Sequence, residues 1–399
     1  MEFTKEKTAS IQFWVLNISS FIAQLTIAMV NLAMVYHLKA FFGLTADKIG
    51  IATSISTATY LVFCIAGASY CTNFRPRNLV EISLAGMAVS VAVFVSATNL
   101  AVAYVSLAFY GAFMSLLWPQ IEGWFSRGKE GRELNHVTNA FNFSWSFGVG
   151  FSSFVAGILV ERSTTLPFYT ALVLFGFVFL VIYLSSVLVP GIRSVASEKT
   201  ERQQSQLKDN STILRYYCWI GLIIVYSGMS LILTIFPLYA KEVLKISEST
   251  TGLLLLIRGV TTCFSFMALG LTGFWQFHKR YIFLTQILFS ILCLAAVKIE
   301  SISGYAVFFF LFGIVFAAGY DQSMFHGVSG CLNRSERMIV HEVLLTVGTI
   351  FGAVFGGYIY ERFSFQTVLL LFGVIAGSVV FLEMAVALVL QRKQSVEQA

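Results

Sequence analysis

Uninterrupted apolar runs of about twenty residues recur along the whole chain, and they limit its possible folds more than any other feature. A helix needs about this length to cross the hydrocarbon core of a bilayer. In lipid, every backbone N–H and C=O must find a partner within the protein, so spanning segments are helices or closed barrels. A barrel would show alternating strands of about ten residues instead. The sequence therefore predicts an all-α, polytopic membrane protein.

Composition supports this prediction. Hydrophobic residues make up 57% of the 399 residues, and only 12% are charged. A soluble domain carries about 25% charged residues, and a soluble core grows too slowly with chain length to bury so much apolar surface. The net charge of +6 does not indicate a nucleic-acid partner, because the basic residues lie in short loops between apolar runs.

Twelve spans are expected, six on each side of a polar stretch. They cover residues 11–37, 49–70, 79–97, 101–125, 140–159, 167–189, 213–239, 251–275, 281–297, 304–325, 340–360 and 367–390. The stretch between the sixth and seventh spans has almost no apolar residues and is typical of a solvated linker. The sequence thus predicts a six-helix bundle over residues 1–189, a linker over 190–212 and a second bundle over 213–399.

The basic residues indicate the orientation. If the N-terminus lies in the cytosol, cytosolic segments contain eighteen of the 26 Lys and Arg residues, and external segments contain seven. Because positive residues concentrate on the cytosolic side of a membrane, both termini and the linker are predicted to be cytosolic. We expect this membrane to be the inner (plasma) membrane of a bacterium.

An internal repeat relates the two predicted bundles. The small residues from Gly148 to Gly157 in span five align without a gap with those from Gly348 to Gly357 in span eleven, at an offset of 200. Gly111 in span four aligns with Gly313 in span ten at an offset of 202. Matches at nearly one offset indicate two related halves in parallel order. Small residues at every fourth position also allow two helices to approach closely.

Six plus six spans, a central cytosolic linker and parallel halves resemble the major facilitator superfamily of secondary transporters. The small-residue motif of spans five and eleven is similar to the glycine-rich span-five signature of that family. Of its loop signature after span two, G-x-x-x-D-R-x-G-R-R/K, this chain keeps only closing basic residues such as Arg77, and Thr72 occupies the acidic position. The resemblance implies a substrate path between the halves near the bilayer midplane. It also implies transport by rocking one half against the other, with spans one, four, seven and ten lining the path.

Arg258 in span eight is the first candidate for contact with substrate. It lies about 12 Å below the outer end of its span, at about 1.5 Å per residue. An ionisable residue within a span is costly, and is by default a functional hypothesis. Arginine stays charged and can grip a carboxylate or phosphate with two parallel hydrogen bonds. Two other interpretations remain open: an arginine that reaches outward to the interface, and one that pairs with a neighbouring helix.

Three acidic residues are candidates for proton coupling. Asp321 lies deep in span ten, where a carboxyl group in low dielectric tends to keep its proton. Its alternatives are a helix cap and a buried salt bridge. Glu122 follows Pro119, which distorts its helix, and Glu342 lies near the cytosolic end of span eleven. The alternative for Glu122 and Glu342 is an interfacial salt bridge or a gate latch where a helix end meets water, and the same interpretation applies to His326 and His341.

Uncharged polar and aromatic residues in four spans complete the set of substrate-binding candidates. They are Gln24, Asn31, Asn142, Trp145, Tyr226, Tyr320 and Gln322. Amide and phenol groups could hydrogen-bond a polar solute in a path between the halves. The alternative for each residue is a hydrogen bond between helices, worth below about 1 kcal/mol.

Together these features predict a secondary active transporter that moves a small organic solute, anionic because of Arg258, by alternating access, with protons as the coupling ion. Two other functions with the same fold are an exporter or flippase of amphipathic drugs or lipids, and a solute sensor that no longer transports. No nucleotide-binding loop, nucleophile motif or paired-carboxylate signature predicts an enzyme. The scattered cysteines predict no metal site, and no cofactor is expected. The expected partners are the solute, membrane lipid and protons, and the protein is expected to be a monomer.

Overall fold

The computed structural model describes residues 5–71, 74–126, 131–189, 210–331 and 334–397. Within these residues the chain forms fourteen α-helices and no β-strand. Twelve candidate membrane spans lie among them, each long and apolar enough to cross a bilayer. The predicted polytopic all-α fold is therefore confirmed. The predicted linker lies almost wholly outside the described residues.

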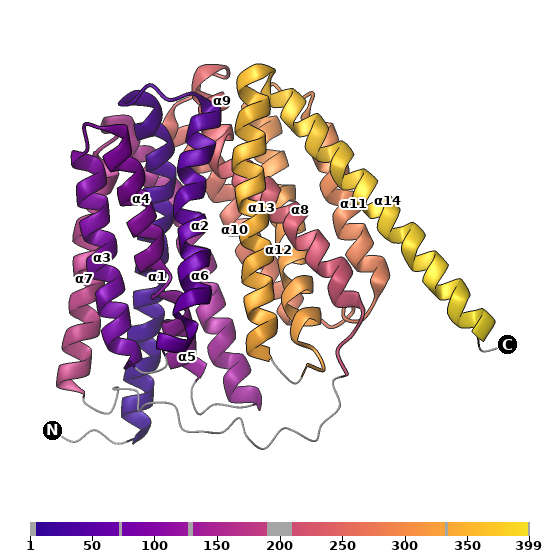
Figure 1. Ribbon diagram of the computed structural model, residues 1–399, viewed down its shortest axis with the longest axis horizontal. Helices are drawn as coiled ribbons and strands as arrows, with labels where there is room; N and C mark the ends of the chain where they lie inside the picture. Colours follow the sequence, from indigo (N-terminus) through magenta and orange to yellow (C-terminus); the bar gives the residue numbers. More distant parts are fainter. Residues whose placement is uncertain (1–4, 72–73, 127–130, 190–209, 332–333, 398–399) are drawn as a thin grey trace.

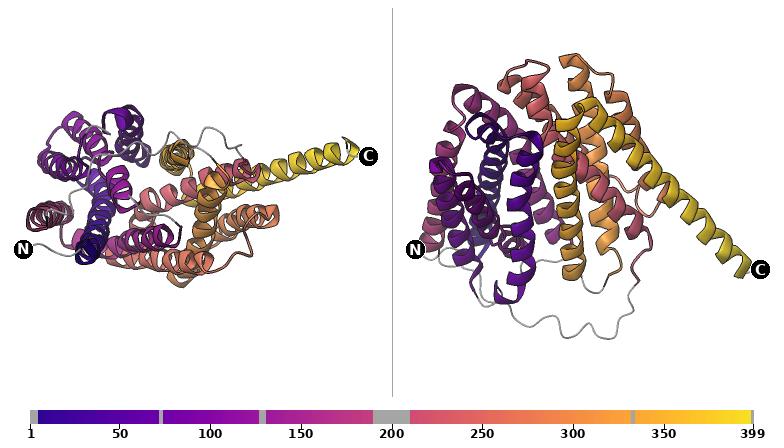
Figure 2. Two further views of the ribbon diagram at one scale, coloured as in Figure 1. Left: turned by 90° about the horizontal axis from the view of Figure 1, so that it is seen from below. Right: turned by 45° about the horizontal axis from the view of Figure 1, so that its top comes forward.

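The helices form two groups that lie side by side (Figure 1). The first group, called the N-terminal half, contains α1 (Lys5–Ala40), α2 (Ala46–Cys71), α3 (Pro76–Ser96), α4 (Leu100–Met114), α5 (Trp118–Ser126), α6 (Gly131–Arg162) and α7 (Leu166–Leu188). The second group, called the C-terminal half, contains α8 (Leu214–Thr234), α9 (Phe236–Glu242), α10 (Glu248–Gly270), α11 (Lys279–Ala296), α12 (Ile302–Val328), α13 (Arg334–Arg362) and α14 (Phe365–Glu397). The start of α1 and the end of α14 lie toward the same end of the molecule, and α14 projects beyond the other helices (Figures 1 and 2).

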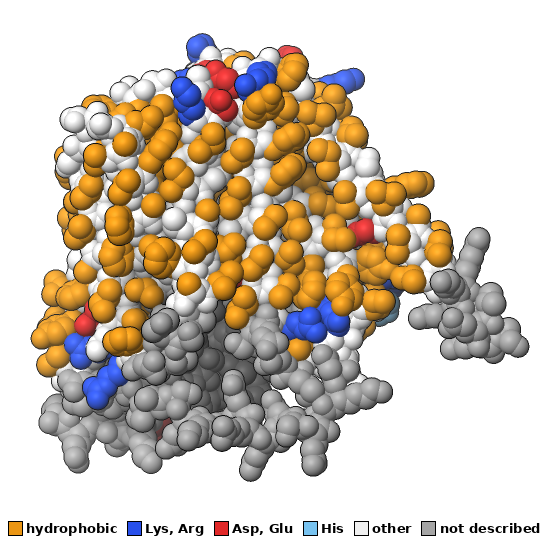
Figure 3. Space-filling view, viewed as in Figure 1, with side chains coloured by type: hydrophobic (Ala, Val, Ile, Leu, Met, Phe, Trp, Pro, Cys, Tyr) orange, Lys and Arg blue, Asp and Glu red, His pale blue; other side chains and the backbone are white. Residues whose placement is uncertain are grey.

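Side-chain types are layered as a bilayer requires. Figure 3 shows hydrophobic side chains over the middle of one face, with most Lys, Arg, Asp and Glu side chains near its two edges. Large apolar residues such as Phe264, Leu271 and Phe381 are highly exposed. Exposed apolar surface of this extent is rare on a soluble monomer. This surface is the one that contacts lipid.

Two of the twelve spans are broken by proline. The fourth span consists of α4 and α5, joined by a tight turn before Pro119. The seventh consists of α8 and α9, with Pro237 in the first turn of α9. Proline has no N–H to donate, and its ring clashes with the carbonyl group four residues earlier. The distortion predicted at Pro119 is therefore a break between two helices, whereas α12, the counterpart of the fourth span, is continuous.

Close helix packing at the repeat glycines joins the two halves. Between α6 and α10, a Cβ at Gly157 would overlap the carbonyl oxygen of Glu248. Between α13 and α2, a Cβ at Gly357 would lie 2.5 Å from the carbonyl oxygen of Ala46. Gly357 and Gly157 are the repeat partners predicted from the sequence. The repeat therefore corresponds to real pseudo-symmetry, and small residues are required where the backbones of opposite halves touch.

Candidate functional site

Arg258 on α10 is buried, and its side chain reaches Met229 on α8. Its side chain is only 1% exposed. Its Nη1 donates to the Sδ atom of Met229 on α8 at 3.1 Å, whereas Nε and Nη2 have no hydrogen-bond partner within the described chain. Thioether sulfur is a weak acceptor, and an ionised group in a low-dielectric interior needs strong partners. The guanidinium group thus has two free donors and no acidic partner among the described residues.

The repeat places a serine in the N-terminal half where the C-terminal half has Arg258. A Cβ at Gly313 on α12 would lie 2.6 Å from the carbonyl oxygen of Arg258. In the N-terminal half, Gly111 packs in the same way on the carbonyl oxygen of Ser56. Both pairs follow the repeat offset of 202, so Ser56 is the counterpart of Arg258. The same backbone contact therefore forms with an arginine in one half and with a serine in the other.

Tyr226 on α8 connects Arg258 to the neighbouring aromatic residues. Arg258 and Glu342 are the charged side chains that lie near it. Its ring lies 5.2 Å from that of Phe316 and 6.1 Å from that of Tyr320, measured between centroids. Gly348 lets α13 approach this point, because a Cβ there would lie 3.0 Å from the Cβ of Tyr226.

Tyr320 on α12 is the centre of an aromatic cluster that draws on both halves. Its ring stacks against Trp145 of α6 at 6.5 Å, and it meets Phe266 of α10 edge-on at 5.6 Å. His341 of α13 approaches it at 5.2 Å. With Tyr226 and Phe316, these residues form the aromatic cluster: Trp145, Tyr226, Phe266, Phe316, Tyr320 and His341. The structure thus brings three predicted substrate-binding residues, Trp145, Tyr226 and Tyr320, into one cluster.

The sequence predicts a position at a helix end for His341, but the structure places this residue deeper. Helix α13 begins at Arg334, two turns before His341. The side chain is 2% exposed, its Nδ1 lies 3.0 Å from Oγ of Ser323, and its Nε2 has no partner within the described residues. Phe266 and Phe316 were also not singled out, because nothing distinguishes them among 39 phenylalanines. Their position becomes apparent only from the contacts of Tyr320.

Asp321 and Gln322 follow Tyr320 on α12, but they lie in different surroundings. Asp321 is half-buried, and the described residues give it no ion pair or hydrogen bond. Gln322 is buried, and its Nε2 donates to the carbonyl oxygen of Tyr281 at 3.2 Å and to Oγ1 of Thr285 at 3.1 Å. Its amide therefore joins α12 to α11 within the C-terminal half. The structure does not place Gln322 with the aromatic cluster.

The polar candidates of the N-terminal half are more scattered. Gln24 on α1 is 8% exposed and its Oε1 has no partner in the described chain, whereas Asn31, two turns further along, is exposed. Asn142 on α6 is half-buried, three residues before Trp145. No contact described for these three residues connects them directly to Arg258.

Of the remaining acidic candidates, Glu342 lies close to the aromatic cluster. It is half-buried on α13, next to His341 in the sequence, and lies near Tyr226. The backbone of Glu122 lies in α5, but its side chain is outside the described residues. No group of three or more His, Cys, Asp and Glu side chains in the described chain could hold a metal ion.

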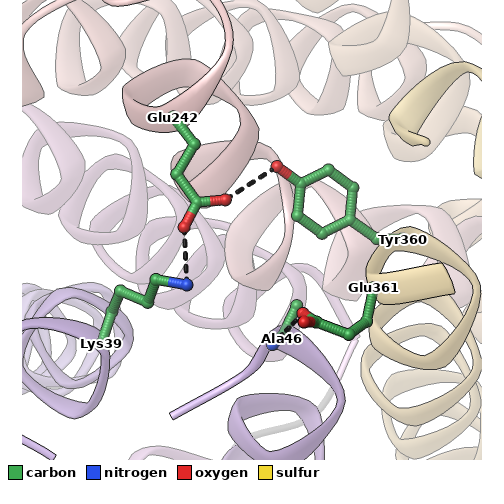
Figure 4. A network of polar contacts seen from close by, with 5 residues as sticks. All are labelled: Lys39, Ala46, Glu242, Tyr360 and Glu361. Carbon is green, nitrogen blue, oxygen red and sulfur yellow. Dashed lines mark hydrogen bonds and ion pairs between the residues drawn. The ribbon is translucent and has the colours of Figure 1, made fainter. Parts of the chain in front are cut away.

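The halves are also joined by polar contacts at the end of the molecule opposite the termini (Figure 4). Lys39 of α1 forms a 2.7 Å ion pair with Glu242 of α9, and the Tyr360 hydroxyl donates to the same carboxylate at 3.1 Å. The backbone N–H of Ala46, the first residue of α2, donates to Glu361 of α13 at 2.9 Å. We call these five residues the distal latch. With the α6–α10 and α2–α13 contacts, it holds the two halves together on this side.

The chain belongs to the Major Facilitator Superfamily, whose family model matches residues 16–329 and 218–398. This membership, together with the twelve spans, makes the protein an integral membrane transporter rather than an enzyme. No curated protein sequence matches the chain significantly.

Solved transporter structures share the fold at low sequence identity. A bacterial homologue of the human lysosomal transporter Spinster, in an inward-facing and unoccupied conformation, has a TM-score of 0.75 at 11% identity, covering 95% of this chain and 97% of that one. The nucleoside transporter NupG has a TM-score of 0.71 at 13% identity, with 94% and 98% covered. The human organic anion transporter MFSD10 (TETRAN) has a TM-score of 0.67 at 12% identity, with 94% and 99% covered. At these identities the similarity establishes the fold alone.

Proposed function

We propose that this transporter moves a small organic anion across the membrane by alternating access, coupled to protons. The observation that carries the proposal is the buried guanidinium group of Arg258, which has two unpartnered nitrogen atoms and no acidic partner among the described residues. A carboxylate or phosphate group of the substrate supplies the missing acceptors. Such charge-assisted hydrogen bonds are about twice as strong as neutral ones.

The aromatic cluster supports an organic rather than an inorganic anion. Trp145 of the N-terminal half contacts Tyr320 of the C-terminal half, and Tyr226 connects Tyr320 to Arg258. The aromatic rings offer apolar surface to the body of a solute, and the Trp N–H and Tyr O–H groups can hydrogen-bond its polar atoms. Because the cluster spans both halves, a bound solute contacts both, as alternating access requires.

Proton coupling is assigned to Asp321, with Glu342 and Glu122 as further candidates. Asp321 is half-buried beside Tyr320 and has no described cation to stabilise its charge. Proton binding by such a carboxyl group removes a costly charge from the membrane interior. We propose that Asp321 takes up and releases the proton while Arg258 holds the anion, which makes the protein a symporter.

The membrane context is also part of the proposal. The excess of basic residues on one side supports cytosolic termini, in the inner membrane of a bacterium. The latched side of the molecule then faces outward, and this conformation accepts solute from the cytosol. We propose that the protein works as a monomer surrounded by lipid.

Arg258→Ala tests the binding role, and Ser56→Ala is its matched control at the repeat-related position. The purified variants are screened by thermal shift against organic acids, sugar phosphates, amino acids, nucleosides and neutral analogues. A ligand of the folded state raises the melting temperature by mass action. We expect at least one organic anion to stabilise the wild type and Ser56→Ala but not Arg258→Ala. An anion that stabilises all three equally contradicts the role of Arg258.

Asp321→Asn tests the coupling separately. In proteoliposomes we expect Asp321→Asn to exchange the anion between compartments but to lose its accumulation under an imposed proton gradient. Accumulation equal to that of the wild type excludes Asp321 as the coupling residue, and the same assay is then applied to Glu342→Gln and Glu122→Gln.

A further inference from the structure

Glu383 on α14 is a buried carboxyl group that lies outside the interface between the halves. It is 6% exposed, and neither of its oxygen atoms has a hydrogen-bond partner among the described residues. Its burial against the other helices excludes a lipid-facing side chain. An isolated carboxylate in such a place would be very costly.

Helices α11 and α14 contact each other on both sides of Glu383 along α14. On one side of it, Oγ of Ser290 on α11 donates to the carbonyl oxygen of Gly373 on α14 at 2.7 Å. On the other side, Nζ of Lys279 donates to Oε1 of Gln391 at 2.9 Å. Glu383 lies between these two contacts along α14.

Gln286 of α11 lies beside the Glu383 carboxyl group. Its side chain is 1% exposed, and its Nε2 donates to the carbonyl oxygen of Tyr217 at 3.1 Å. Its Oε1, however, has no donor within the described chain. Three buried oxygen atoms, two of Glu383 and one of Gln286, therefore lack a hydrogen. Buried polar atoms are rarely left unpaired.

No cation among the described residues compensates a charge on Glu383. The titratable groups that face it come from α8, namely Tyr217 and Cys218. Behind them His326 of α12 accepts a hydrogen bond at Nε2 from the backbone N–H of Phe277 at 3.0 Å, and its Nδ1 lies 2.9 Å from the carbonyl oxygen of Gln322. An Nε2 atom that accepts a hydrogen bond belongs to a neutral imidazole.

We propose that Glu383 is a proton-binding site separate from the substrate path, in which the carboxyl group keeps its proton and donates it to Oε1 of Gln286. One proton removes the charge, and its hydrogen bond gives the amide oxygen a donor. The protonated pair also stabilises the docking of α14 on α11. Because this site is outside the interface, the inference does not depend on the role of Asp321 or Arg258.

Infrared difference spectroscopy of the purified protein at neutral pH tests this directly. We expect a protonated-carboxyl band that is lost in Glu383→Gln and kept in both Asp321→Asn and Glu300→Gln, an exposed control. If Glu383→Gln does not fold, Gln286→Leu serves instead, because loss of the acceptor shifts the band without removing it. The proposal is overturned if no band depends on residue 383 or 286.

Melting temperature provides a second test of the same site. A carboxyl group that is neutral in the folded protein and ionised in the unfolded chain makes folding bind a proton, so its stabilising effect decreases as pH rises. We therefore expect the wild type to lose stability on alkalinisation more steeply than Glu383→Gln. Equal slopes contradict the proposal, as does Na⁺-specific stabilisation that Glu383→Gln abolishes, which would indicate a metal cation in place of the proton.

Discussion

The Nζ atom of Lys39 in the last turn of α1 lies 2.7 Å from Oε1 of Glu242 on α9. This ion pair links the two halves at the end of the molecule opposite the termini. Both side chains are more than one-third exposed, and such a pair contributes about 0–1 kcal/mol. The pair still matters because it exists only while this side is closed. A free-energy difference of this size changes the ratio of two conformations by up to about fivefold.

Lys39→Ala is predicted to shift the protein modestly toward a conformation in which the latched side is open. The readout is the labelling of a single cysteine at position 153, introduced after the six native cysteines are replaced. Ser153 is chosen because it is 3% exposed and its carbonyl oxygen faces Gly252 across the α6–α10 contact. We expect an impermeant thiol reagent to label this cysteine about two- to fivefold faster in Lys39→Ala. Lys298→Ala, an exposed control, leaves the rate unchanged. Identical rates in the two variants would show that the ion pair does not contribute to closure.

Glu361→Ala is predicted to open the same side more strongly. Glu361 accepts a hydrogen bond from the first backbone N–H of α2, which belongs to the other half, and loss of a helix cap costs about 0.5–2 kcal/mol. Its repeat partner Glu161 is exposed, and the corresponding helix α10 is capped by its own Ser247. We therefore expect faster labelling at position 153 in Glu361→Ala and the wild-type rate in Glu161→Ala. Equal labelling rates in Glu361→Ala and Glu161→Ala would contradict a cap that only Glu361 provides across the halves.

Trp145→Ala is predicted to weaken binding of the organic anion. Aromatic pairs are worth about 0.5–1.5 kcal/mol beyond the area they bury, so the dissociation constant should rise about two- to tenfold. Trp145→Phe keeps a ring and should restore most of the affinity. Phe147→Ala removes an exposed ring from the same helix and should have no effect. Titration calorimetry measures all three, and unchanged affinity in a folded Trp145→Ala protein would remove this residue from the site.

The repeat and the spans could be predicted from the sequence because both depend on residue type and spacing. Small residues at an offset of 200 predicted close helix packing, and Gly157 and Gly357 do contact the opposite half. The breaks before Pro119 and Pro237 could not be predicted, because the sequence does not show where one helix ends and the next begins. Proline allows a break at such a point but does not by itself predict one, since its effect depends on the surrounding turn.

The candidate site was less predictable, because the rotation of each helix about its axis decides which of its residues belong to the site. Asp321 and Gln322 are neighbours in sequence, yet the Gln322 amide binds α11 while Asp321 has no described partner. The depth of His341 could not be predicted either, because the sequence does not show that α13 begins two turns earlier, at Arg334. In a span that is apolar on every side, hydropathy carries no rotational information, so only the contacts reveal which face is directed inward.

The most direct test is uptake of the stabilising anion into proteoliposomes under an imposed proton gradient, in the wild type, Arg258→Ala and Ser56→Ala. Hydrogen bonds to charged groups contribute about 1.5–3 kcal/mol, so we predict that Arg258→Ala lowers uptake at subsaturating substrate by at least about tenfold. Ser56→Ala should accumulate the anion as the wild type does. Wild-type accumulation by a folded Arg258→Ala protein would contradict the account, because the buried guanidinium group of Arg258 would then have no part in transport.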